Sequence, residues 1–69
     1  MGKVKEVRPI RGYLEVLFEG ELIVNIGAAA QPSLKEGSKV DFIEWAPVDG
    51  IYQGKIRTED GRLHYCWRV

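Results

Sequence analysis

The sequence predicts an all-β fold, a small closed barrel of five or six short strands. Turn residues recur at short intervals, around 9–12, 19–21, 32–37, 47–50 and 59–61. Runs rich in valine, isoleucine, leucine and aromatic residues lie between these turns, which is the pattern of a small barrel or sandwich. No stretch keeps the apolar period of an amphipathic helix long enough to form one. Closure of the sheet removes the exposed strand edges that promote aggregation.

The clearest element is a pair of strands joined by a tight turn at Gly20. We expect strands over residues 3–8, 12–19 and 21–26, with side chains that alternate between the two faces. The inward set is apolar and consists of Leu14, Val16, Phe18, Leu22, Val24 and Ile26. The same alternation turns outward Tyr13, Glu15, Leu17, Glu19, Ile23 and Asn25.

A long connection over residues 27–38 is expected to follow the hairpin. Its alanines at 28–30 allow one turn of helix, which Pro32 ends. The turn at 59–61 contains Asp-Gly, a strong hairpin signal. Three further strands are expected, over residues 39–45, 51–58 and 62–69.

The second half holds most of the large aromatic side chains. We expect Val40 and Phe42 in the core. A short chain needs its largest side chains for packing, so we also expect most of the other large aromatic residues of this half to lie in the core. These residues are Trp45, Tyr52, Tyr65 and Trp67. The last strand closes the barrel, extends a hairpin or pairs with another molecule, and the pattern leaves these alternatives open.

Length and composition limit the possible functions. The chain has 69 residues, enough for one domain over 1–69, with ten basic and ten acidic side chains. Its one cysteine and one histidine exclude an internal disulfide and a tetrahedral zinc site, so we expect no metal and no cofactor. The first residues lack the apolar core of a signal peptide, and no apolar run is long enough for a membrane helix. We therefore expect a cytoplasmic protein.

The sequence does not predict an enzyme. His64 and Cys66 alternate on one strand, but side chains at i and i+2 lie about 7 Å apart, beyond hydrogen-bond reach. The sequence contains no phosphate-binding loop, no metal-ligand spacing and no pair of acids with a recognisable role. Cys66 is expected to be a small apolar side chain in the interior.

Four stretches resemble the bacterial cold-shock domain over residues 2–44. Gly2-Lys3-Val4-Lys5 resembles its opening strand, and Arg11-Gly12-Tyr13 resembles the start of its first ribonucleoprotein motif. Leu22-Ile23-Val24-Asn25-Ile26 lies where the second motif would lie. The stretch over 33–42 is similar to the one that leads into the family's fourth strand.

A second resemblance, over the first five expected strands, is to the S1-type barrel of the first bacterial translation initiation factor, whose motif corresponds to residues 48–56. That family carries an Asp, a short spacer and Gly-Arg-Ile, where this chain has Asp49 and Gly54-Lys55-Ile56. Both families have the OB fold and bind nucleic acid. The resemblance therefore implies a five- to six-stranded OB-type barrel, with an SH3-like barrel as the alternative because strand number does not separate the two.

The chain departs from the cold-shock family on the surface where that family stacks bases. The aligned positions are Glu6, Tyr13, Glu15, Ile23, Asn25 and Ile26, and only Tyr13 is aromatic. Tyr13 is either a stacking surface or a partly covered tyrosine of a small barrel. Carboxylates at Glu6 and Glu15 would repel phosphates and resist desolvation.

Two functions remain open from the sequence. The first is single-stranded RNA or DNA binding, with candidate contacts at Lys3, Lys5, Arg8, Arg11, Tyr13, Asn25, Lys55 and Arg57, and additional stacking on Trp45, Tyr52 or Trp67. The second is a protein-interaction module or regulatory adaptor that has lost the nucleic-acid face and binds a protein partner or its own copy. The outward apolar pair Leu17 and Ile23 favours this second function.

Overall fold

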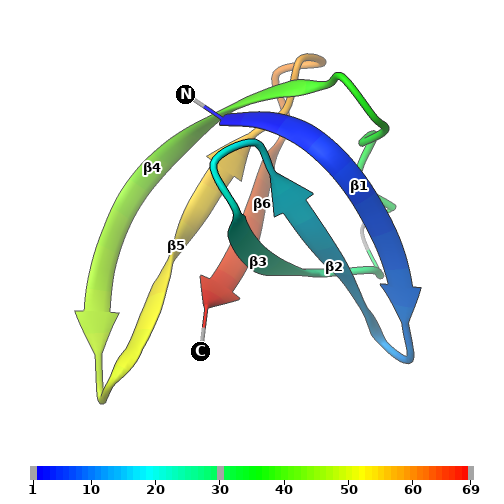
Figure 1. Cartoon of the computed structure of the whole chain (residues 1–69). Coiled ribbons are helices and arrows are strands. Elements are labelled where there is room, and N and C mark those ends of the chain that lie inside the picture. Colours follow the sequence, from blue (N-terminus) through cyan, green and yellow to red (C-terminus); the bar gives the residue numbers. More distant parts are fainter. Residues whose placement is uncertain (1, 30, 69) are drawn as a thin grey trace.

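Six antiparallel strands close into a barrel in the computed structural model, which describes residues 2–29 and 31–68 (Figure 1). The order around the barrel is β1-β2-β3-β6-β5-β4, and β4 returns to β1. None of the described residues forms a helix, so no membrane-crossing helix is found among them. The strands are β1 (Gly2–Ile10), β2 (Tyr13–Phe18), β3 (Leu22–Gly27), β4 (Lys39–Val48), β5 (Ile51–Arg57) and β6 (Leu63–Arg68).

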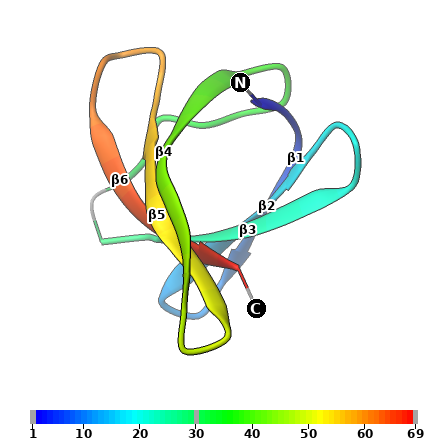
Figure 2. The ribbon, with the colours of Figure 1, turned by 90° about the vertical axis from the view of Figure 1, so that its left-hand side faces the viewer.

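The barrel consists of two three-stranded meanders, β1-β2-β3 and β4-β5-β6, which lie on opposite sides in Figure 2. Two short seams join them. Gly2 and Lys3 of β1 pair with β4, and Asn25 and Ile26 of β3 pair with β6. Beyond these seams the strands separate, and the β1-β2 and β4-β5 hairpins spread apart toward one end (Figure 1).

The predicted inward face of the first hairpin is confirmed. Leu14 and Leu22, at its ends, are half-buried and pack against the core, and Phe42 does the same from β4. The Phe18 and Phe42 rings meet edge to face with centroids 5.1 Å apart. The fully buried apolar side chains are Val4, Val16, Phe18, Val24, Ile26, Val40, Ile56 and Cys66.

The fourth strand is longer than the sequence predicts, because it continues through Pro47 to Val48. A proline lacks the N–H that a central strand needs, so it is tolerated only at a free edge. β4 has such an edge here, since β1 pairs only with Lys39 and Val40. Asp49 and Gly50 then form the turn, with φ of 50° and 79°. Positive φ at both positions is the signature of a two-residue type I′ hairpin.

A bulge in β4 explains Gly54 of the facing strand. Glu44 has φ of 57°, and the register between β4 and β5 shifts between Ile43 and Ala46. A Cβ at Gly54 would lie 2.8 Å from the Ile43 carbonyl oxygen and 3.0 Å from a carbon of the Trp45 ring. The close approach of the bulge therefore requires glycine at this position.

The last strand closes the barrel between β3 and β5, and its orientation corrects the predicted core. His64 and Cys66 face inward and are buried. The expectation that the large aromatic residues are core is wrong for Tyr52 and Tyr65, which are 48% and 54% exposed. Trp45 and Trp67 are half-buried. The physical reason for Tyr65 is the strand period of two, because inward neighbours at 64 and 66 force residue 65 outward.

The connection between the meanders holds no helical turn in its described part. Ala28 and Ala29 form a turn, with the Gln31 N–H donating to the Ala28 carbonyl at 2.9 Å. Residue 30 of the expected turn lies outside the described residues, as does residue 69 of the expected last strand. At the far end of the connection, the Gly37 N–H donates to the Val4 carbonyl at 2.8 Å and ties the segment to β1.

Candidate nucleic-acid interface

One row of outward side chains runs across four strands of the barrel. Glu15 of β2 is opposite Asn25 of β3, Asn25 is opposite Trp67 of β6, and Trp67 is opposite Gln53 of β5. Residues directly opposite one another on antiparallel strands share a face. The register therefore places residues from all four strands on one continuous outer surface.

Three aromatic rings gather on this surface, and we call Tyr13, Tyr65 and Trp67 the aromatic platform. Trp67 contacts both tyrosines, with ring centroids 5.9 Å from Tyr13 and 5.8 Å from Tyr65. The Tyr65 and Trp67 planes are within 29° of each other, so these rings are stacked. The Tyr65 hydroxyl donates a hydrogen bond to the Gln53 side-chain oxygen. This bond fixes the exposed ring by an anchor on the next strand.

Gly27 leaves an opening in the platform. It lies opposite Tyr13 on β2. On the other side, Ile26 pairs with Cys66 of β6. Because the strands are antiparallel, the next residue of β3, Gly27, is opposite the preceding residue of β6, Tyr65. A Cβ at Gly27 would meet no atom within 4 Å. The space between the two tyrosines is therefore open to solvent at the level of β3.

A shallow hollow of about 220 Å³ begins at this glycine, and we call it the Gly27 hollow. Most of its lining is apolar. Leu63 and Tyr65, both more than half exposed, are its large side chains. The full lining is Gly27, Ala29, Leu63, His64 and Tyr65.

Two basic residues of β5 border the hollow. Lys55 is opposite Tyr65, and Arg57 is opposite Leu63. The Lys55 ammonium lies 3.8 Å from the Glu44 carboxylate, at the exposed end of the β4 bulge. Within residues 2–29 and 31–68, no carboxylate forms an ion pair with Arg57 or with Arg11, which lies in the turn just before Tyr13. Positive charge is thus available on two sides of the platform.

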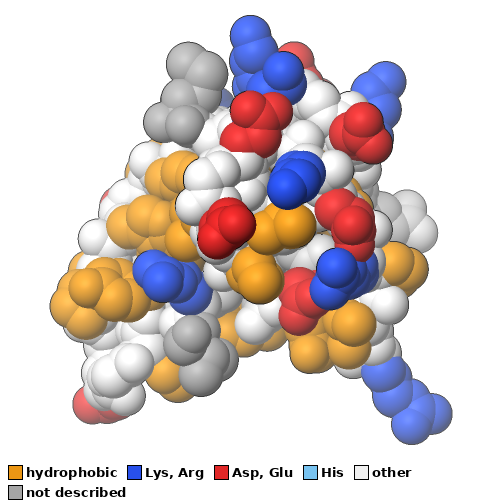
Figure 3. Space-filling model, in the orientation of Figure 1, with side chains coloured by type: hydrophobic (Ala, Val, Ile, Leu, Met, Phe, Trp, Pro, Cys, Tyr) orange, Lys and Arg blue, Asp and Glu red, His pale blue; other side chains and the backbone are white. Residues whose placement is uncertain are grey.

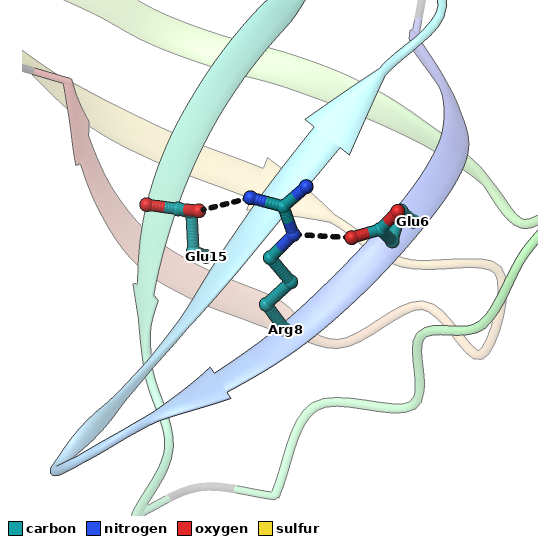
Figure 4. Close-up of polar contacts among 3 residues, drawn as sticks. All are labelled: Glu6, Arg8 and Glu15. Carbon is teal, nitrogen blue, oxygen red and sulfur yellow. Dashed lines mark hydrogen bonds and ion pairs between the residues drawn. The ribbon is translucent and has the colours of Figure 1, made fainter.

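Arg8 lies on the same face, but acidic side chains already engage its guanidinium. It donates to the Glu6 carboxylate and, at 3.4 Å, to the Glu15 carboxylate (Figure 4). The hydrogen bond and charge of Glu6, followed by those of Glu15, raise the pKa of Arg8. Arg8 therefore does not offer a free charge to phosphate. Its single positive charge offsets only one of the two negative charges of Glu6 and Glu15, so these carboxylates still oppose a phosphate at this position, as the sequence predicts.

The remaining two predicted cations lie elsewhere. Lys3 and Lys5 are near the start of β1. Tyr13 of the platform pairs with Ile10, which is the last residue of β1. Seven residues of strand separate Lys3 from Ile10, about 23 Å at 3.3 Å per residue. Lys3 also pairs with Glu19 at 3.7 Å. On the face shown in Figure 3, acidic and basic side chains are interleaved and form no single basic patch.

The structure thus brings together five of the eight predicted contacts. Lys3 and Lys5 lie away from these five, and the charge of Arg8 is engaged by Glu6 and Glu15. The five on or beside the platform are Arg11, Tyr13, Asn25, Lys55 and Arg57.

Sequence reasoning underestimated the last strand, which supplies two of the three platform rings. Tyr65 and Trp67 were expected mainly in the core, and Gly27 and Gln53 were not singled out. One signal was available. Cysteine is among the residue types most often fully buried, so an inward Cys66 places residues 65 and 67 outside.

His64 lies behind the platform as a buried polar side chain. It is 4% exposed, and no described residue forms a hydrogen bond with either ring nitrogen. Burial, reinforced by the charge of Arg62, lowers the pKa of His64, and Asp60 opposes this shift. Burial also raises the pKa of the Cys66 thiol to about 11. Both side chains are uncharged at neutral pH.

No family model, curated protein or solved structure matches the chain. The chemistry of the platform is therefore the guide to its ligand. Partly exposed aromatic rings beside hydrogen-bonding amides and exposed cations suit a planar, polar and negatively charged molecule. An unpaired nucleotide combines these properties, because it has a flat base with polar edges and a phosphate.

Proposed function

We propose that this domain binds single-stranded nucleic acid on the outer face of β2, β3, β6 and β5. The observation that carries the proposal is the aromatic platform, in which Trp67 contacts both Tyr13 and Tyr65 and all three side chains are partly exposed on one face. Base stacking on an aromatic side chain contributes about 1–3 kcal/mol per base and tolerates any sequence. A platform that stacks two bases gives useful affinity even for a chain of zero net charge.

An OB-type barrel is the finer fold that we propose with this function. OB barrels bind oligonucleotides on the face of their second and third strands. Tyr13 and Asn25 lie on the outer faces of β2 and β3. In this chain β6 extends that face with Tyr65 and Trp67. The cytoplasm, where unpaired RNA and DNA are accessible, is the compartment that we propose.

Salt dependence tests this proposal. For single strands, log K falls with log salt by about 0.7 for each phosphate neutralised. Three cations border the platform, Arg11, Lys55 and Arg57, so we expect a slope no steeper than about −2 in a titration of a fluorescein-labelled eight-residue oligonucleotide followed by anisotropy. The matching duplex is the control and should bind more weakly, because its bases are already stacked. Absence of binding at 20 mM salt, or equal affinity for the duplex, contradicts the proposal.

A second candidate function, docking of a protein partner or a second copy, rests on a different part of the same face. Leu17 and Ile23 are opposite each other on β2 and β3, and Ile23 is 46% exposed. Adjacent outward apolar side chains are common at protein interfaces. Light scattering that shows a dimer, in a protein that fails to bind the oligonucleotide, would favour this second function.

A further inference from the structure

We propose that the Gly27 hollow is a pocket for one unstacked base, whose edge is read by main-chain groups of β6. This inference rests on the proposed function and adds a site to it. The platform stacks bases in any order, whereas a pocket that makes hydrogen bonds distinguishes one base from another.

The walls of the hollow fit the flat faces of a base. Gly27 forms its floor on the platform side and leaves open the space that a side chain would fill. Leu63 and Tyr65 are successive outward residues of β6, 51% and 54% exposed, and both line the hollow. Two large, exposed apolar side chains at a concave site indicate a surface that a ligand covers.

The main chain of β6 supplies the polar groups. Pairing between β6 and β3 includes Asn25 with Trp67 and Ile26 with Cys66, and no described residue of β3 pairs with Leu63 or His64. Along an antiparallel strand, successive residues direct their N–H and C=O groups to opposite neighbours. One of these two residues therefore presents both groups to the β3 side, where β3 has ended and the hollow lies.

An N–H and a C=O on the same side of a strand form a donor and acceptor pair. The edges of nucleic-acid bases carry complementary donors and acceptors. Main-chain groups on an exposed strand edge without a partner strand are satisfied by water, and an incoming ligand can replace that water with its own hydrogen bonds. The hollow therefore combines apolar walls with a fixed hydrogen-bonding edge.

The phosphate of the same nucleotide has two cations within reach. Lys55 and Arg57 are opposite the two wall residues, one strand further from the hollow, a separation of about 4.8 Å between strands. A nucleotide whose base enters the hollow would leave its sugar and phosphate over β6 and β5. There the guanidinium of Arg57 has no carboxylate partner among the described residues.

The pocket is tested by a substitution at Gly27 that places a side chain in the hollow. Gly27 does not have a positive φ, and an added Cβ meets no atom, so Gly27→Val is compatible with the strand. Anisotropy titrations with labelled eight-residue homopolymers of dA, dC and dT should show at least a fivefold spread of affinity for the native protein. In Gly27→Val we expect the tightest of the three to weaken at least fivefold and the spread to disappear, while weaker binding to the platform remains.

Three further variants complete the test. Gly27→Ala adds only a methyl group and should have an intermediate effect. Ile23→Ala, on the same strand and face but outside the hollow, should bind within twofold of the native protein. If Gly27→Val lowers the melting temperature, Leu63→Ala tests the pocket instead. This variant removes one wall of the hollow at an exposed position, so it should also reduce the spread of affinity among the three homopolymers.

The outcomes separate the two proposals. Native-like affinity and spread in Gly27→Val and Leu63→Ala overturn the base pocket but leave platform binding intact. Loss of the spread with residual binding supports the pocket. Absence of binding by the native protein overturns the proposed function and the pocket together.

Discussion

Replacing Trp67 with alanine should weaken binding of a single-stranded oligonucleotide by roughly 10- to 100-fold. The indole is the centre of the aromatic platform, since it contacts both Tyr13 and Tyr65. Its removal abolishes one stacking surface, a loss of about 1–3 kcal/mol, and also removes the packing partner of both tyrosines. Anisotropy of a labelled oligonucleotide measures the change without relying on tryptophan emission.

Tyr52→Ala is the matched control for this variant. Tyr52 is also an exposed aromatic residue, but its ring lies against Trp45, with centroids 6.5 Å apart, and beneath the guanidinium of Arg68. It is not part of the aromatic platform. We expect Tyr52→Ala to bind within twofold of the native protein. An equal loss of affinity in both variants would mean that the ligand contacts aromatic residues in general, and would contradict the assignment of the site.

The free energy of unfolding should fall as the pH drops below about 6.5. His64 is buried, without a hydrogen-bond partner among the described residues, and burial lowers its pKa in the folded protein. Between its folded and unfolded pKa values the unfolded chain binds the extra proton, so acid favours unfolding. The stability is complete above the unfolded pKa of about 6.5 and decreases below it, by at most about 1.4 kcal/mol per pH unit. Urea unfolding at pH 7.5, 6.5, 5.5 and 5.0 measures the decrease.

His64→Leu isolates this effect. Leucine fills a similar volume and has no polar atom to bury, so we expect the variant to be about 1–2 kcal/mol more stable at pH 7. It should also lose the decrease between pH 6.5 and 5. The lowered pKa of Asp60, caused first by its hydrogen bond from Thr58, acts in a different range, because its contribution is lost only below about pH 3.8. A variant that retains the full decrease above pH 5 would show that another group titrates.

The first hairpin could be predicted from the sequence because its period is unambiguous. Val16, Phe18, Val24 and Ile26 are all buried, and none of the residues between them within each strand is. The last strand gives no such signal. Tyr65 and Trp67 have the size and apolar surface of core residues. The residues that face inward instead include His64, although histidine as a residue type is usually at least partly exposed.

The candidate site could be predicted only in part, because it depends on contacts between distant segments. Tyr13 and Trp67 meet across β3 because Asn25 pairs with Trp67, and no local pattern specifies the pairing of residues so far apart in the chain. The charges illustrate the same limit. Arg8 and Arg57 are equivalent in the sequence, but only Arg8 is engaged by carboxylates among the described residues, from Glu6 on its own strand and from Glu15 across the hairpin.

Amide chemical-shift mapping tests the binding face most directly. A ¹⁵N-labelled sample titrated with an unlabelled single-stranded octamer reports every backbone N–H and the indole N–H of both tryptophans. We predict that the largest shifts occur at Tyr13, Asn25, Gly27, Tyr65 and Trp67, including the Trp67 indole. Largest shifts in the β4-β5 hairpin around Trp45 and Tyr52, or no shifts at all, would contradict the account.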